Sequence, residues 1–508
     1  MAVQKAAAAS SSGFDAVVEH ILIHYRWAFV ILLLPISLVY DVLLYVRSWV
    51  VFQLSSAPHK HGSKVENVAK QVRQWRAEGA RQPMCTARPS WQTMSFRRAK
   101  YKKTMFAVNV NLVDILDLNT ERRTVRVEPL VTMGQLTATL DPLGWTLPFV
   151  PELDDLTVGG LVMGTGVETS SHKYGLFQHI CVAYELVLAD GSIVQVTKES
   201  DPDLFYSVPW SYGTLGFLTA VEIKIVPALR FVKLQYEPVR SLEEADTVLR
   251  KHLDHPEENE FIEALMFSKD EGVVMTGNMV SCADWGKLNE IGRCHKPWFF
   301  EHVRSFLRSG PGFEYIPLRD YQHRHTRSFF WEMKEIIPFG NNPLFRYLFG
   351  WMTPPKVSLL KLTQTQAVKK LYESNHIIQD MLVPIEKFKE SVLFFDKEVA
   401  VYPLWLCPFR LPSEPGMLRV PKDAMYLDIG VYGVPTRKDF DPKETTRRIE
   451  AFVAKAKGFQ MLYADTYTTR DEFRQMFDHS LYDKMRARLK CEKAFPEVYD
   501  KVCRKARD

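Results

Sequence analysis

The sequence lacks any pair of closely spaced cysteines. Its seven cysteines are odd in number and scattered, at Cys85, Cys181, Cys282, Cys294, Cys407, Cys491 and Cys503. No C-x-x-C pair occurs among them, which argues against a disulfide or zinc framework. Unpaired cysteines are typical of a protein kept in a reducing compartment.

Dense runs of lysine and arginine with interleaved aromatic residues are also missing. The formal net charge is only +5 over 508 residues, so we expect no nucleic-acid partner. The chain has no G-x-G-x-x-G fingerprint in a strand-turn-helix setting, and a Rossmann nucleotide site is therefore not indicated.

Only one long apolar run is present, and it follows a tail that we assign to residues 1–26. The segment 27–49 contains Ala28 to Val46, which is long enough to cross roughly 30 Å of hydrocarbon as a helix. Pro35 and Asp41 weaken a clean span, so an interfacial anchor and a buried helix remain alternatives. We expect an uncleaved, single-pass anchor with the main body in the cytosol.

The remaining chain, with 46% apolar residues overall, can form two or three domains. Its patterns predict a helix over 63–79, two strands within 109–128 and a short helix over 132–144 that Thr132 caps. The alternation across 181–197 predicts a hairpin around Asp190-Gly191. A short helix and a closing strand are expected within 200–227, and amphipathic helices over 443–458 and 469–489.

A glycine-rich segment lies in the middle of this region. Four glycines fall within the eight residues from Gly159 to Gly166. A backbone without side chains can pass close to a large ligand and present its amide groups to an anion. Tight packing without any ligand explains this segment equally well when it is considered alone.

Neighbouring sequence motifs favour the ligand-binding interpretation of this segment. VRVEPLVTMGQL, LTVGGLVMGTG, the ADGS hairpin and YGTLGFLTAV occur in this order. Together they resemble the FAD-binding domain of the vanillyl-alcohol oxidase/p-cresol methylhydroxylase (PCMH) superfamily. The resemblance implies an α+β fold with a two-subdomain FAD-binding domain (58–227). An α+β substrate-binding cap (228–440) and a C-terminal segment returning to the active site (441–508) would follow.

The same resemblance implies which residues contact FAD. They are Thr157, Val158, Gly159, Gly160, Leu161, Val162, Met163, Gly164, Thr165, Gly166, Val167, Glu168 and Thr169, with Gly213, Thr214, Gly216 and Thr219 as a lesser set. The loop from Cys85 to Thr93 departs from the superfamily, because it has no histidine or glycine. We therefore expect non-covalent FAD, with Arg88 or Ser90 near its phosphates.

Longer strings point to one branch of the superfamily. These are His323 to Met352, LLKLTQ (359–364), GFQMLYADTYTTRDEF (458–473) and AFPEVYDK (494–501). They resemble the Δ24-sterol reductase family, and the likeness extends over nearly the whole chain. It implies reduction of a C24=C25 double bond in a sterol side chain, with NADPH as reductant and the endoplasmic reticulum membrane, or also the Golgi membrane, as location.

Such an isolated alkene needs a positioned acid, because hydride alone adds poorly to it. The candidates are Tyr463 and Tyr467 in the C-terminal segment, with Glu168 and His172 beside the glycine segment. For a tyrosine near strand ends, the alternative is an ordinary hydrogen-bonded core residue. The donor therefore stays undecided among the four.

The sequence His323-Arg324-His325-Thr326-Arg327 has no evident third ligand, so we expect no metal site there. Its arginines belong either to an interdomain face or to a site for dinucleotide phosphates. For the whole chain, a flavin-dependent alcohol or lactone oxidase and a membrane-tethered scaffold with an inactive flavin fold remain rival functions. Either the monomer or an oligomer is compatible with the sequence.

Overall fold

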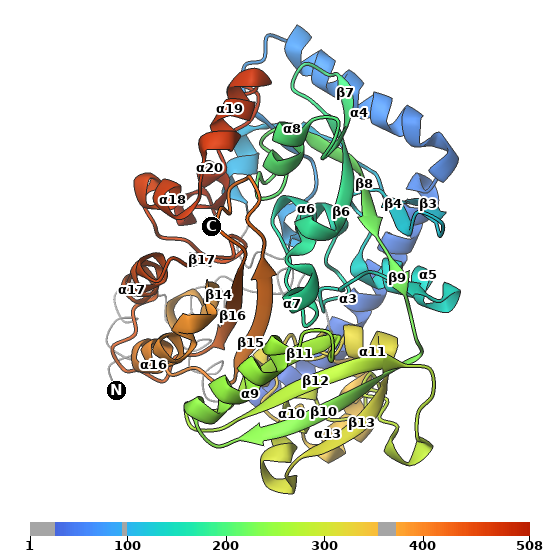
Figure 1. Cartoon of the computed structure of the whole chain (residues 1–508). Coiled ribbons are helices and arrows are strands. Elements are labelled where there is room, and N and C mark those ends of the chain that lie inside the picture. Colours follow the sequence, from blue (N-terminus) through green and yellow to red (C-terminus); the bar gives the residue numbers. More distant parts are fainter. Residues whose placement is uncertain (1–25, 94–98, 354–371, 508) are drawn as a thin grey trace, which may run out of the picture.

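The computed structural model describes residues 26–93, 99–353 and 372–507, and its mixture of helices and two large sheets confirms the predicted α+β class (Figure 1). Most of the predicted tail (1–26) and the string at 359–364 lie outside the described residues. A short parallel pair, β1 (Met84–Thr86) with β2 (Phe106–Val108), leads from the first helices into the first large sheet.

The first large sheet has five antiparallel strands in the order β3-β4-β8-β6-β7. These are β3 (Ile115–Asn119), β4 (Thr124–Val127), β8 (Phe217–Lys224), β6 (Cys181–Val187) and β7 (Ile193–Thr197). The predicted hairpin is β6 and β7, and Gly191 makes its turn at a φ of +81°, where glycine is favoured. The predicted strands within 109–128 are β3 and β4.

Short helices surround this sheet. They are α4 (His61–Ala77), α5 (Met133–Leu140), α6 (Val158–Met163), α7 (Ser171–Tyr174) and α8 (Pro202–Ser207). Helix α4 forms as its spacing predicts, because Val65, Val68, Val72 and Trp75 are all buried on one face. Thr132 caps α5 as predicted, and the structure adds that it does so in a capping box with Gln135.

The second large sheet has eight strands in the order β13-β10-β12-β11-β15-β16-β14-β17, and every neighbouring pair is antiparallel. The strands are β10 (Phe231–Val239), β11 (Phe261–Met266), β12 (Gly272–Val280), β13 (Gly312–Pro317), β14 (Ile377–Pro384), β15 (Leu404–Leu411), β16 (Ala424–Gly433) and β17 (Phe459–Gln460). A short pair, β5 (Trp145–Thr146) with β9 (Val226–Pro227), precedes it.

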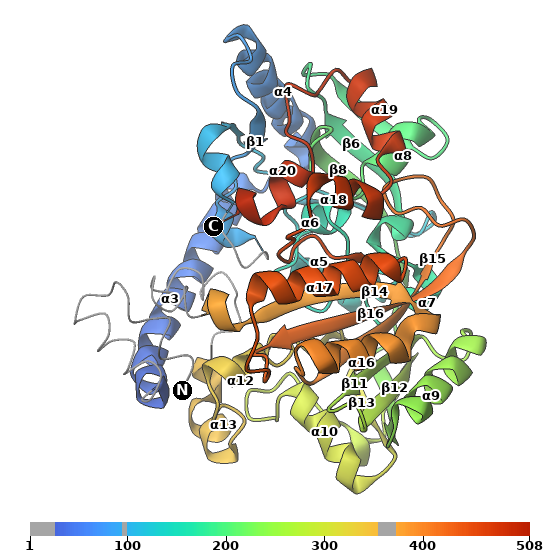
Figure 2. The ribbon, with the colours of Figure 1, turned by 90° about the vertical axis from the view of Figure 1, so that its left-hand side faces the viewer.

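The two faces of the eight-stranded sheet have different neighbours. Helices α9 (Leu242–Asp254), α16 (Phe388–Glu398) and α17 (Pro442–Lys455) pack on its outer face in a separate apolar cluster (Figure 2). Met381 and Val383 of β14 belong to that cluster. Side chains alternate along a strand, so Asp380 and Leu382 point to the inner face, which meets the five-stranded sheet.

Beyond β17 the chain crosses back to the first sheet through α18 (Arg470–Met476), α19 (Ser480–Arg488) and α20 (Tyr499–Val502). Helix α19 contacts α8, and Arg486 donates to the carbonyl of Thr214 at 3.0 Å. The amide of Met84 also donates to the carbonyl of Ala494 at 2.7 Å. The C-terminal segment therefore joins the two sheets. The domain boundaries expected from the sequence remain predictions.

The apolar run near the N-terminus forms one continuous helix, α3 (Arg26–Ser55), which passes through Pro35 and extends beyond the predicted end at residue 49. Within the described residues, Leu34–Ser55 is the helix segment long and apolar enough to cross a membrane, with a mean hydropathy of 1.4. Figure 2 shows α3 running along the side of the folded body instead of projecting from it.

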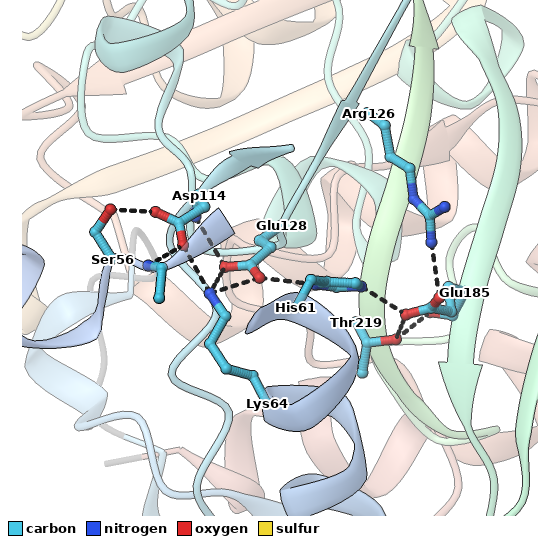
Figure 3. A network of polar contacts seen from close by, with 9 residues as sticks. Ser56, His61, Lys64, Asp114, Arg126, Glu128, Glu185 and Thr219 are labelled. Atoms are coloured by element: carbon cyan, nitrogen blue, oxygen red, sulfur yellow. Dashed lines mark hydrogen bonds and ion pairs between the residues drawn. The ribbon is translucent and has the colours of Figure 1, made fainter. Parts of the chain in front are cut away.

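A buried polar network fastens the junction of α3 and α4 to the five-stranded sheet (Figure 3). His61 contacts Glu128 at 2.8 Å through Nδ1 and Glu185 at 3.0 Å through Nε2. Lys64 pairs with both Asp114 and Glu128 at 2.7 Å. Burial lowers the pKa of His61, but its hydrogen bonds to the two glutamates raise that pKa more, to about 9. His61 is therefore a cation at neutral pH.

We expect His61→Gln to lower the free energy of unfolding by about 2 kcal/mol at pH 6, because hydrogen bonds to charged groups are lost. The pKa of His61 is higher in the folded state than the ordinary value of 6.5. Its stabilisation is therefore complete below pH 6.5 and disappears as the pH rises through about 9. Urea unfolding at pH 6, 8 and 9.5 would measure this difference.

The matched control is His59→Gln, because His59 is exposed two residues earlier. Its unfolding midpoint should follow that of the unsubstituted protein at every pH. An equal effect of His61→Gln at pH 6 and pH 9.5 would contradict the assignment of a charged His61.

Candidate active site

A cavity of about 1430 Å³ lies between the five-stranded sheet, the inner face of the eight-stranded sheet and α3. Its walls include the glycine segment, the loop from Cys85 to Thr93, strand β14 and the C-terminal residues 461–467. Sites for one small ligand usually measure roughly 300–1,000 Å³. This cavity is therefore large enough for an extended cofactor together with a second ligand.

The glycine segment provides one wall of the cavity. Nine of its thirteen predicted residues line it: Thr157, Gly159, Gly160, Leu161, Met163, Gly164, Thr165, Gly166 and Val167. The other four, Val158, Val162, Glu168 and Thr169, are buried behind them. The segment is not a loop throughout, because its first part forms α6, whose cap Thr157 accepts from the amide of Gly160 at 3.4 Å.

Close packing against neighbouring residues explains why glycine is needed in this wall. A Cβ atom on Gly159 would lie 2.7 Å from Cβ of Pro129, and one on Gly166 would lie 2.8 Å from Cδ2 of Leu161. Neither position could accept a side chain without moving the wall. The lesser predicted set contributes Gly213 and Gly216 to the lining, whereas Thr214 and Thr219 are fully buried.

Cationic side chains border the same cavity, and Arg88, Lys102 and Lys501 are among them. Arg88 donates to Oγ1 of Thr157 at 3.1 Å, and Lys102 donates to the carbonyl of Arg88 at 2.7 Å. Burial and the neighbouring Lys102 lower the pKa of Lys501 to about 8. A wall with arginine and lysine side chains beside a glycine segment suits a phosphate-containing ligand. Of the two predicted phosphate contacts, Arg88 lines the cavity and Ser90 is not among its lining residues.

A carboxyl group with two tyrosines lies in another part of the lining. Asp380 projects from the inner face of β14, and Tyr463 donates to its Oδ2 at 2.6 Å. Tyr432 on β16 donates to Oδ1 of the same carboxyl. Burial raises the pKa of Asp380 to about 6, although both tyrosine hydrogen bonds oppose this increase. Burial also raises the pKa of Tyr463 well above its ordinary value.

A second buried carboxyl lies beside Asp380. Asp428 lies on the neighbouring strand β16, on the same inner face, and is fully buried. Burial and the charge of Asp380 raise its pKa far above the ordinary range. Burial thus favours the uncharged form of Asp428. Asp380 lines the cavity and is the carboxyl that can exchange a proton with it.

The four predicted acids differ in position. Tyr463 and Tyr467 line the cavity. The side chain of Glu168 instead accepts from Arg324 at 2.7 Å. His172 is buried, with its two ring nitrogens 3.0 and 3.1 Å from the carbonyls of Thr169 and Asn259. Burial lowers the pKa of His172 to about 4, so its ring is neutral.

The arginines of the 323–327 segment have structural partners. Arg324 lies between Glu168 and Glu263, and its side chain is fully buried. Arg327 donates to three backbone carbonyls, those of Ile291, Cys294 and Lys296. This geometry favours an interdomain role over a phosphate site. Within residues 26–93, 99–353 and 372–507, no group of three or more potential ligands is arranged for a metal ion.

Sequence reasoning missed Asp380, Tyr432, Lys102 and Lys501. One signal was available for Asp380, because it is the only charged residue in the apolar strand sequence IIQDMLVP. A single carboxyl in such a strand indicates a buried and therefore perturbed group. Tyr432 and the two lysines gave no comparable signal, since their partners lie far away in the sequence.

Comparison with known proteins agrees with this geometry. A family model described as an FAD binding domain matches residues 63–197. The cavity, its glycine wall and its cations together with this match define the class of the protein as an FAD-binding protein of the vanillyl-alcohol oxidase/PCMH type.

Full-length relatives identify the branch. The Δ24-sterol reductase of Homo sapiens is 58% identical over 96% of this chain and 95% of its own length. A Δ24-sterol reductase homologue of Caenorhabditis elegans is 47% identical over 97% of both chains. The L-gulonolactone oxidase of Mus musculus is 24% identical over 72% of this chain. The chain belongs to the Δ24-sterol reductase family.

We expect Gly159→Ala to weaken FAD binding, because its Cβ would meet Pro129 and displace the start of α6. Overpacking of this kind costs about 1–3 kcal/mol, which corresponds to a loss of roughly 5- to 150-fold in affinity. The ratio of flavin to protein absorbance after dialysis would measure it. Gly62→Ala is the control, since a Cβ at Gly62 has no atom within 4 Å. Equal flavin contents in the two variants would refute the proposed wall.

Proposed function

We propose that this protein reduces the C24=C25 double bond of a sterol side chain, with FAD as its cofactor and NADPH as the source of electrons. Full-length similarity to proteins named Δ24-sterol reductase supports the substrate and the reaction. The observation that carries the proposal is the Tyr463–Asp380 pair on the wall of a cavity that also contains the glycine segment.

The residues of the cavity fit FAD. The glycine wall from Thr157 to Gly166 would lie along the cofactor, and Arg88, Lys102 and Lys501 would stabilise its anionic groups. When bound and reduced, FAD supplies a hydride equivalent to the substrate. The loop from Cys85 to Thr93 contains no histidine, which supports non-covalent binding.

The protein must then supply the proton. An isolated alkene accepts a proton at C24, which leaves the developing positive charge on the tertiary C25 that receives hydride. Tyr463 is placed to donate this proton from the cavity wall. When Asp380 is protonated, its hydrogen bond with Tyr463 reverses, and the carboxyl O–H donates to the phenolic oxygen of Tyr463. The phenolic O–H is then free to transfer its proton to C24 while the proton of Asp380 moves to the phenolic oxygen. One proton and one hydride then complete the saturated bond.

Tyr432 positions this pair, because it donates to the other oxygen of Asp380. Tyr467 also lines the cavity and is the alternative donor. Glu168 and His172 are less suitable, since their side chains contact Arg324 and backbone carbonyls respectively. Apolar lining residues, among them Phe329, Phe330 and Trp405, would keep water from the reacting carbons.

The setting that family membership favours is a sterol-synthesising membrane. We place the protein on the endoplasmic reticulum membrane, or also the Golgi membrane, with membrane lipid as a partner and its main body in the cytosol. The apolar helix α3 supports attachment to a membrane. NADPH would reduce the flavin in the same cavity before the sterol enters, and an oligomer is compatible with this scheme.

The reaction can be tested with the full chain purified in detergent. Under anaerobic conditions, NADPH should reduce the bound flavin, and a Δ24-unsaturated sterol should then reoxidise it with one saturated side chain formed per flavin. Reoxidation by oxygen alone would instead favour an alcohol or lactone oxidase. Failure to bind any flavin would favour an inactive, membrane-tethered scaffold.

We expect Tyr463→Phe to slow sterol-dependent reoxidation of the flavin by about 10²–10⁴-fold, the usual contribution of a general acid. Its flavin content should be unchanged. Tyr426→Phe is the matched control, because Tyr426 lies on β16 away from the cavity lining and donates to the carbonyl of Lys457. Stopped-flow absorbance would compare the variants. If Tyr463→Phe reacts as fast as the control, Tyr463 is not the proton donor, and Tyr467 becomes the candidate.

The rate should also depend on pH through Asp380. Its proton is needed for catalysis, so the reoxidation rate should fall as the pH rises through the pKa of Asp380, about 6. Asp380→Asn should be slow and should lose this pH dependence. A pH profile of Asp380→Asn that matches the unsubstituted protein would exclude Asp380 from the proton pathway.

A further inference from the structure

Helix α3 has two chemically distinct faces between residues 34 and 55. One face lines the cavity with Leu34, Ser37, Leu44, Arg47, Ser48, Val51, Phe52 and Ser55. Successive members are one, three or seven residues apart, which places them on one side of a helix. All the serines and charged residues of this stretch belong to that side, including Asp41, which lies four residues after Ser37.

The opposite face is apolar and exposed. It carries Ile36, Val39, Tyr40, Val42, Leu43, Tyr45, Val46, Trp49, Val50 and Leu54. Soluble monomeric proteins rarely expose a continuous apolar patch as large as this one. Ser37, Arg47, Ser48 and Ser55 of α3 therefore lie on the cavity side, and the outward side is apolar except for the exposed Gln53.

Contacts with the same folded body occur near both ends of this stretch and at Arg47. Leu34 is only 5% exposed and belongs to the main core. Arg47 lies over the ring of Trp91 at 5.5 Å. Just after the helix, Ser56 and the amide of Ala57 donate to Asp114 at 2.6 and 2.8 Å (Figure 3).

These contacts are incompatible with a helix that crosses a bilayer. The 22 residues from Leu34 to Ser55 extend over about 33 Å at 1.5 Å per residue, which is the thickness of the hydrocarbon core. If they crossed it, the cavity wall and the Trp91 contact would be drawn into lipid. A helix that lies along the membrane surface avoids this cost.

A second apolar surface adjoins α3. The short helix α13 (Pro343–Phe349) and the turn η7 (Gly350–Met352) expose Leu344 (69%), Tyr347 (69%), Leu348, Phe349 and Trp351. Phe345 and Arg346 hold this unit in place, because Phe345 packs against Phe339 and Arg346 donates to the carbonyls of Asn341 and His295. The turn η7 contacts α3, and Figure 2 shows α13 next to its N-terminal end.

We propose that α3 and the α13–η7 unit form one membrane-contacting surface, on which the protein lies in a single leaflet without crossing the bilayer. The outward apolar residues of both elements enter the boundary between headgroups and acyl chains, where tyrosine and tryptophan are favoured. This surface departs from the single-pass anchor expected from the sequence. Because α3 also forms a wall of the cavity, a lipid-dissolved substrate would meet the site directly at the membrane.

The orientation of α3 can be measured by spin labelling of the full chain in phosphatidylcholine vesicles. The exposed cysteines Cys282 and Cys294 are first replaced by serine. Single cysteines at positions 39, 46, 50 and 54 then carry the label, and collisions with oxygen and a nickel complex report its depth. We expect similar, shallow depths at all four positions. A regular change in depth across them, or full water exposure, would overturn the proposal.

The α13–η7 unit provides an independent test. Leu344→Glu combined with Leu348→Glu should lower the ratio of vesicle-bound to free protein at least ten-fold in flotation. The matched control combines Leu143→Glu with Leu393→Glu, two exposed leucines outside this surface, and should bind as the unsubstituted protein does. Equal binding of both double variants would refute the second contact. Neither test uses a sterol, so failure of the proposed reaction would be recognised separately.

Discussion

Arg324 is a fully buried cation held between two carboxylates from different parts of the fold. Its Nη2 atom lies 2.7 Å from Glu168, directly after the glycine wall, and its Nε atom lies 2.9 Å from Glu263 on β11. Burial raises the pKa of Glu263, but Arg324 and the neighbouring His325 together outweigh burial and lower this pKa to about 2. Removing one partner of such a group costs about 3–5 kcal/mol. The two large sheets are therefore held in one relative position.

That position creates the cavity. Trp405 also donates to Glu263 at 2.8 Å, so the ion pair is continuous with the inner face of the eight-stranded sheet. Strand alternation then places Asp380 on this inner face, close to the returning C-terminal segment that carries Tyr463. The glycine wall and the acid pair belong to different segments, and the rigid contact between the sheets brings both to one cavity.

Helix α3 forms a further wall of the cavity. The apolar run in its sequence therefore has a role in the site as well as at the membrane. A hydrophobic segment of this length normally suggests a span. In this fold Ser37, Arg47, Ser48 and Ser55 line the cavity, and the network of Asp114, Lys64 and Glu128 fastens the junction with α4. One helix thus forms part of the site and part of the membrane-facing surface.

Local features were determined by the sequence itself. The capping box at Thr132, the hairpin at Gly191, the α4 stripe and the glycine segment depend on neighbouring residues, so their patterns predict them. The family strings likewise predicted the family. Tertiary structure alone decided that Tyr463 meets Asp380, 83 residues earlier, that Glu168 instead pairs with Arg324, and which side of α3 faces outward. Such contacts depend on how distant segments pack, and the spacing of residues along a chain does not specify that packing.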